Sequence, residues 1–169
     1  MFKNKLNFSV FLILPFLISF VAHFLYSIIP FPLFAIYFPI NESIFEHTKL
    51  TFTPIILTYL FFYIKFRKNF NMKKFLSSMI ISISLTLVTM LSLYYITQLV
   101  FKKEIVLVSI LCLLTAIIVG QLIAIYTYNS NIEWSIDLSI YILITVTFTL
   151  LILTIHPPAL NFFTDPSLK

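Results

Sequence analysis

Residues 41–50 read NESIFEHTKL, and the rest of the chain is organised around this stretch. It holds two carboxylates, one imidazole and one ammonium group in a chain that is 60% hydrophobic. Charged groups are costly near hydrocarbon unless they are paired or have a function. Ser43 followed three residues later by Glu46 has the spacing of a capping box, which predicts that a helix starts here with Glu42 just ahead of it. The stretch therefore marks both a helix start and a cluster of polar groups.

The composition of the whole chain indicates an integral membrane protein. Of its 169 residues 18% are aromatic and only 10% are charged, whereas soluble domains carry roughly 25% charged residues. The apolar residues come in blocks of about 20, which is the length that crosses a hydrocarbon core as a helix, while a barrel strand needs about 10. The sequence predicts an all-α, polytopic transmembrane helix bundle that forms a single domain over residues 1–169.

We expect about five spans, and the positive charges predict their orientation. The spans are expected at about 6–29, 44–63, 75–101, 105–128 and 136–155. Residues 65–74 carry five of the eleven Lys and Arg residues, so the positive-inside rule places this loop and the N-terminus inside and the C-terminus outside. The 41–50 stretch, the turn at 102–104 and the tail at 156–165 are then predicted on one outer face.

Charge and cysteine usage exclude several other classes. The net charge of +5 does not indicate nucleic-acid binding, because the basic residues lie in short clusters beside apolar blocks, where they act as topology signals. The single cysteine, Cys112, leaves no internal disulfide or thiolate metal cluster. One glycine is too few for a phosphate-cradling loop. Richness in Ile, Phe, Lys and Asn fits an AT-rich genome and predicts a multi-pass protein of a bacterial cell membrane.

The ionisable groups expected near the outer face form a candidate metal site. The candidate ligands are His23, His47 and His156, and the candidate catalytic carboxylates are Glu42 and Glu46. Imidazole and carboxylate suit Zn²⁺, Mn²⁺ or Fe²⁺, and such an ion lowers the pKa of a bound water to about 7 while a free carboxylate acts as base. The candidate binding residues around them are Asn41, Lys49, Lys102, Lys103 and Asp165, with Asn41 orienting and the lysines of the turn guiding a headgroup.

Each of these groups also has a structural explanation. Glu46 could close the capping box with Ser43 and pair with Lys49 three residues on. His23 could bond to the backbone of another helix or to Tyr26. No His-Glu-x-x-His element is present, so spacing does not decide between ligand and structural roles. The remaining groups could be solvated at headgroup level or at helix ends: Glu42, His47, Lys102, Lys103, His156 and Asp165.

Three short motifs carry a resemblance to a known family. They are HFLY at 23–26, PINESIFEHTKL at 39–50, and PP at 157–158 followed by FTDP at 163–166. With these motifs the chain resembles an uncharacterised family of small polytopic bacterial membrane proteins of unknown function. The resemblance implies that the three motifs belong together and implies no reaction.

Two functions of different classes follow. In the first, an outward-facing polar site binds a divalent metal such as Zn²⁺ and acts on a lipid or lipid-linked substrate by hydrolysis or group transfer. In the second, the protein is a non-enzymatic accessory or transport-related subunit, whose capped helix start serves packing, a membrane protein partner or a homo-oligomer. For both functions we expect the lipid bilayer as the environment and no nucleic acid as a partner.

Overall fold

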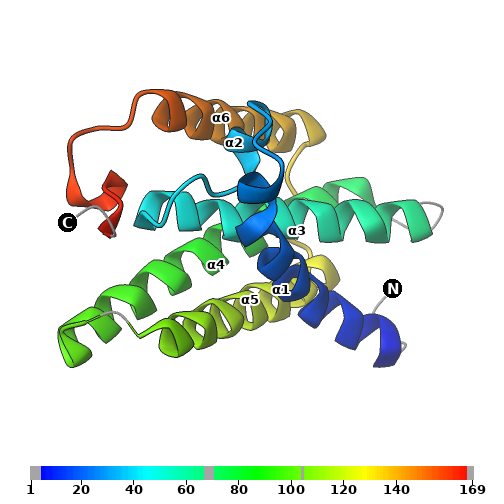
Figure 1. The fold of residues 1–169 in the computed structure, drawn as a ribbon. Coiled ribbons are helices and arrows are strands. Elements are labelled where there is room, and N and C mark those ends of the chain that lie inside the picture. The colour runs from blue at the N-terminus through cyan, green and yellow to red at the C-terminus, as the bar shows by residue number, and fades with distance from the viewer. Residues whose placement is uncertain (1–4, 67–70, 104, 167–169) are drawn as a thin grey trace.

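The computed structural model describes residues 5–66, 71–103 and 105–166, and the regular structure within these ranges is helical (Figure 1). Five helices are long and apolar enough to cross a membrane, which confirms the predicted all-α bundle with five spans. Of the five basic residues at 65–74, Arg67 and Lys68 lie outside the described residues, as do Lys3, Glu104 and Lys169. The elements are α1 (Lys5–Ile28), α2 (Phe34–Tyr37), α3 (Ile44–Phe66), α4 (Met72–Phe101), α5 (Val106–Asn129), α6 (Ile136–Ile155) and the short 3₁₀ turn η2 (Asn161–Phe163).

Helix α3 is the centre of the bundle. In Figure 1 it runs between α6 on one side and α4 and α5 on the other, while α1 crosses the bundle obliquely. Buried side chains follow α3 along nearly its whole length, from Phe45 to Phe62. Its aromatic residues pack edge to face on α1, with the Phe11 ring 5.3 Å from that of Tyr59 and 5.2 Å from that of Phe62. The helix that begins in the 41–50 stretch is therefore the most buried of the five candidate spans.

Helices α4 and α5 form the most extensive helix pair. Gly120 of α5 lies so close to α4 that a Cβ atom there would come 2.0 Å from Thr86 Oγ1 and 2.9 Å from the Ser82 carbonyl oxygen. Small residues permit this close approach of two helices in a membrane. Next to it the buried Gln121 accepts a hydrogen bond from Ser82 Oγ (2.9 Å) and donates one to the Phe11 carbonyl of α1 (3.3 Å). The pair is thus locked in register and tied to α1.

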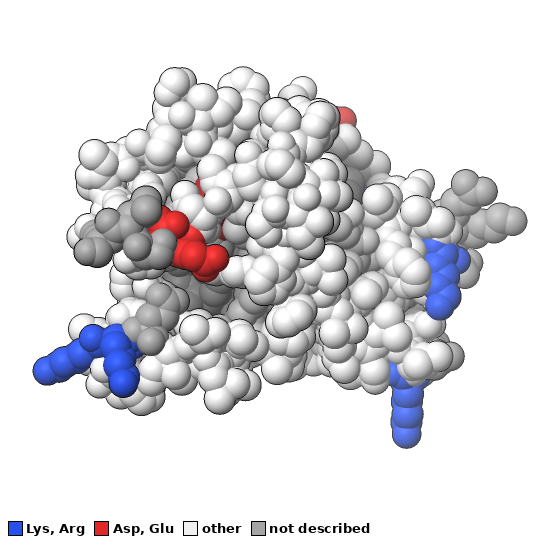
Figure 2. Space-filling view, in the orientation of Figure 1, with Lys and Arg blue, Asp and Glu red and all other residues white. Residues whose placement is uncertain are grey.

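The two ends of the bundle differ from its middle. Figure 2 shows Lys and Arg side chains at the two ends of the visible face; the surface between them is mostly uncharged, apart from Asp and Glu atoms that lie mainly toward the left-hand end. The start of α3, the turn from α4 to α5 and the tail after α6 lie at one end (Figure 1), as the predicted order of spans requires. We call this end the α3-start end. Its assignment to the outside, with the N-terminus inside, stays a prediction.

Candidate metal centre

The start of α3 is fixed by its own short polar side chains. Asn41 Oδ1 accepts a hydrogen bond from the Ser43 N–H (2.9 Å), and Ser43 Oγ accepts one from the Glu46 N–H (3.3 Å). The second bond is half of the predicted capping box; the Glu46 carboxylate accepts from the Ile40 N–H instead (2.9 Å). Residues 40–43 are consequently held in one conformation, which directs the side chain of Glu42.

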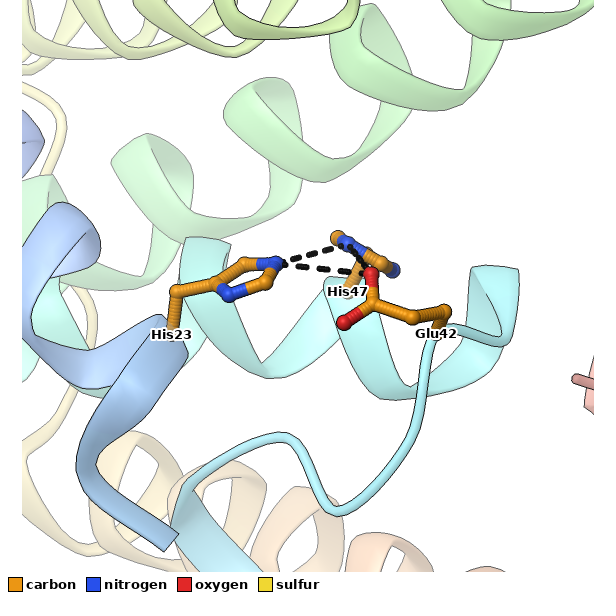
Figure 3. A group of neighbouring side chains, drawn as sticks. All are labelled: His23, Glu42 and His47. Atoms are coloured by element: carbon orange, nitrogen blue, oxygen red, sulfur yellow. Dashed lines mark hydrogen bonds and ion pairs between the residues drawn. The ribbon is translucent and has the colours of Figure 1, made fainter. Parts of the chain in front are cut away.

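Three of the predicted site residues converge in front of this helix start. Figure 3 shows His23 of α1, Glu42 of the loop and His47 of α3 turned toward one another. The distances are 3.2 Å from His23 Nε2 to His47 Nε2, 3.6 Å from His23 Nε2 to Glu42 Oε2, and 3.4 Å from His47 Nε2 to Glu42 Oε2. The same three atoms make all three contacts, so they form a compact triangle. We call these residues the triad.

The size of this triangle matches a metal site. Two ligand atoms bound to one zinc ion at 2.0–2.1 Å with a tetrahedral angle lie about 3.3–3.4 Å apart, and the three edges are close to that value. The His47 ring is also held as a ligand should be, because its Nδ1 lies 2.9 Å from the Ser43 carbonyl oxygen. A carbonyl can only accept, so Nδ1 donates to it, and in the neutral form of the ring Nε2 would present its lone pair to the triangle. His23 Nδ1 is buried and has no hydrogen-bond partner among the described residues.

The charges of the triad suit a divalent cation. As ligands, two neutral imidazoles and one carboxylate would carry one negative charge, so a bound M²⁺ would keep one net positive charge. The side chains of His23 and His47 are 26% and 30% exposed and that of Glu42 is 55% exposed, so a fourth position could be reached from solvent. Three protein ligands with an open position are typical of catalytic rather than structural zinc.

Glu46 and Lys49 form a separate, buried pair on the other side of the same helix turn. The Lys49 Nζ donates to Glu46 Oε2 (2.6 Å) and to the carbonyl of Ala35 (2.7 Å), and the two side chains are 0% and 3% exposed. Because Glu46 Oε2 also accepts from the Ile40 N–H, the pair fastens residues 35–40 to α3. The predicted pairing of Glu46 with Lys49 is thus observed, while the predicted capping box is only half formed. Glu42 rather than Glu46 stands beside the two histidines.

The other predicted site residues lie around the triad or away from it. Asp165 Oδ2 accepts a hydrogen bond from the Glu42 N–H (3.2 Å), so the tail reaches the loop. Lys102 and Lys103 are exposed at the turn between α4 and α5. His156 caps the end of α6, is exposed, and is not part of the cluster that the described His, Cys, Asp and Glu side chains form. Its predicted role as a ligand stays a prediction.

A family of unknown function (DUF6512) matches residues 3–168. The chain belongs to this family. The match covers nearly the whole sequence, which confirms the predicted membership in a family of unknown function. No curated protein and no solved structure matches the chain.

In this DUF6512 member the triad opens into a cavity of about 220 Å³ between the spans. The cavity is lined from α4 by Met90, Tyr94 and Thr97, at i, i+4 and i+7, and from α5 by Ser109 and Cys112 among others. None of these residues is among the predicted site residues. The signal was their helical spacing, which puts them on one face of each helix.

Proposed function

We propose that His23, Glu42 and His47 hold one divalent transition-metal ion, zinc first, and that this centre acts on a lipid or lipid-linked substrate in the cell membrane. The observation that supports the metal is the triangle of Nε2, Nε2 and Oε2 atoms with edges of 3.2, 3.4 and 3.6 Å. The observation that supports the substrate class is the place of this triangle, at the mouth of a cavity between membrane-spanning helices. On the predicted topology the centre faces the outside.

The reaction class we propose is metal-assisted hydrolysis or group transfer. His23, Glu42 and His47 would hold the ion, and the ion would make a water or substrate hydroxyl give up its proton more readily, so that its oxygen could form a bond to the carbonyl carbon or phosphorus of the substrate ester. The bond to the leaving oxygen would break, and that oxygen would take up a proton. The exposed Glu42 carboxylate could pass these protons to solvent, through the oxygen that does not face the histidines. Glu46 is engaged with Lys49 and acts in this proposal only by positioning.

Metal analysis of the purified chain tests the centre directly. The protein is purified anaerobically in detergent, and its metal content is measured by inductively coupled plasma mass spectrometry. We expect about one ion per chain, loss of the ion in His23→Ala and His47→Ala, and retention in His156→Ala, the matched control outside the triad. No stoichiometric metal, or equal loss in all three variants, would overturn the proposal.

A second experiment distinguishes a catalytic metal centre from one that only binds the ion. Proteoliposomes are loaded with a total membrane lipid extract, and lipid composition is followed by mass spectrometry with and without added zinc. We expect a lipid to be consumed by the wild-type protein and not by His47→Ala.

The second candidate function is that of a non-enzymatic accessory or transport-related subunit. Its support is that most polar groups of the 41–50 stretch serve to build the helix start, through the bonds of Asn41, Ser43, Glu46 and Lys49. It predicts that Glu42→Ala and His47→Ala alter co-purification of a membrane partner while no turnover is found. Turnover that survives purification and is lost in His47→Ala would count against it.

A further inference from the structure

Three cavities meet at the triad, and His23 lines all of them. The first, of about 220 Å³, lies among α3, α4 and α5. The second, of about 140 Å³, lies between α1 and α5. The third, of about 300 Å³, is formed with Pro30 and Pro39 of the connector between α1 and α3 (residues 29–43) and reaches Asn41 and Glu42 at the polar end. The triad therefore stands at a junction between space inside the spans and space at the polar end of the bundle.

The two cavities between the spans form one apolar region. They share the walls Leu50, Val106, Ile110 and Leu113. Along α4 the first cavity extends from Thr97 to Met90, a depth of about 10 Å at 1.5 Å per residue, or about a third of a hydrocarbon core. Thr97 and Ser109 lie near the α3-start end with the triad, while Met90 and Leu113 lie deeper. Polar groups at one end and apolar groups at the other are complementary to an amphiphile.

The apolar region also opens sideways. Phe20 and Phe24 of α1 and Val106 of α5 line the second cavity and are 58%, 49% and 72% exposed. All three belong to helices long enough to span the bilayer, so this exposed rim faces acyl chains. A hydrocarbon chain could pass from the bilayer to the cavity without contact with water.

We propose that the substrate is a phospholipid of the surrounding bilayer, one acyl chain of which enters between α1 and α5 and lies along the wall of α4 and α5. This inference rests on the proposed function and names the substrate of that centre. The carboxyl end of this acyl chain places the ester and phosphate region of the phospholipid at the triad. The turn from α4 to α5, with the exposed Lys102 and Lys103, lies at the same end (Figures 1 and 2) and favours an anionic phosphate over a neutral headgroup.

Photo-crosslinking tests the chain site. The purified full-length protein is reconstituted in vesicles that contain a phosphatidylglycerol with a diazirine in one acyl chain, and labelled peptides are mapped by mass spectrometry. We expect labels on Met90, Ile110 or Leu113. In Leu113→Trp, labelling of these positions should fall about tenfold, the effect of an over-packing penalty of about 1.4 kcal/mol. Leu111→Trp is the matched control, because Leu111 is on the same helix but 51% exposed.

Metal content is measured on the same samples, so that the two proposals fail separately. Wild-type metal content with no cavity label refutes the acyl-chain site and leaves the metal centre standing. Cavity label without metal refutes the metal centre alone. Labels confined to exposed positions, or equal labelling in Leu113→Trp and Leu111→Trp, would overturn the inference. Should Leu113→Trp fail to fold, Ile110→Phe takes its place, because Ile110 lines both cavities and a larger side chain there narrows them. The same fall in labelling is expected.

Discussion

Removal of the Lys49 ammonium group should destabilise the whole bundle more than any surface charge would. In Lys49→Met the side-chain volume is nearly kept, but the Glu46 carboxylate stays buried with only the Ile40 N–H as a partner for Oε2. Because the two side chains are 0% and 3% exposed and their charged atoms are 2.6 Å apart, the scale for a buried pair applies. Breaking such a pair from one side costs about 3–5 kcal/mol. For a chain of this size that corresponds to a fall in Tm of roughly 6–20 °C.

The assay is thermal unfolding in detergent, followed by circular dichroism, with two further variants. The double variant Glu46→Gln, Lys49→Met has no buried charge, and its glutamine oxygen can still accept from Ile40; we expect it to regain most of the lost stability. Lys65→Met removes an exposed lysine from the same helix, near the rings of Phe61 and Phe66, and should cost about 1 kcal/mol or less. A Lys49→Met protein as stable as Lys65→Met, or a double variant no better than the single one, would refute the reasoning.

Three further outcomes follow from the packing and the triad. Gly120→Ala should lower the free energy of unfolding by about 1–3 kcal/mol, because the new Cβ meets Thr86 Oγ1 at 2.0 Å and the Ser82 carbonyl at 2.9 Å; unchanged thermal unfolding would show that α4 and α5 part easily. Phe163→Ala should speed proteolysis of the tail, because the ring of Phe163 packs 4.9 Å from that of Phe45; unaltered cleavage would mean that other contacts hold the tail. Zinc on the triad should bind more weakly when the pH falls from about 7.5 to about 5.5, since protons compete for imidazole nitrogen; an apparent zinc affinity that does not change with pH in equilibrium dialysis would count against the histidines as ligands.

The spans could be predicted because their lengths are set by the bilayer. The largest differences are at the basic end, where α3 continues to Phe66 beyond the predicted 63 and α4 starts at Met72 ahead of the predicted 75. Hydropathy marks where the hydrocarbon ends, whereas a helix ends where its backbone groups find other partners. A signal for the second boundary was present: Asn71 is an N-cap whose side chain accepts from the Lys74 N–H (3.2 Å).

The sequence was sufficient to propose the candidate residues of the site, but not to predict which of them lie together. All groups of the triad were among the candidates, because polar side chains near hydrocarbon are few. Which carboxylate faces the histidines depends on the path of residues 30–40, and that path is fixed by long-range bonds such as Lys49 Nζ to the Ala35 carbonyl and Thr53 Oγ1 to the Tyr37 carbonyl (both 2.7 Å). Periodicity carries no information about such bonds. Periodicity does place the residues of α4 and α5 that line the cavity on one face of each helix, but nothing in the sequence marks that face as a cavity wall.

The adjacency of Glu46 and His47 explains how ten residues serve two purposes. Neighbours on a helix point about 100° apart, which prevents both from binding one ion but lets them face different surroundings. Glu46 turns to the connector and, with Lys49, fixes residues 35–40. His47 turns to His23, and the fixed connector delivers Glu42 to the same point. A buried ion pair gains little net stability over an apolar pair of the same shape. The role of the Glu46–Lys49 pair is therefore positional, because it fixes the loop that supplies Glu42, the third corner of the triangle. Loss of Lys49 should then weaken metal binding as well as folding.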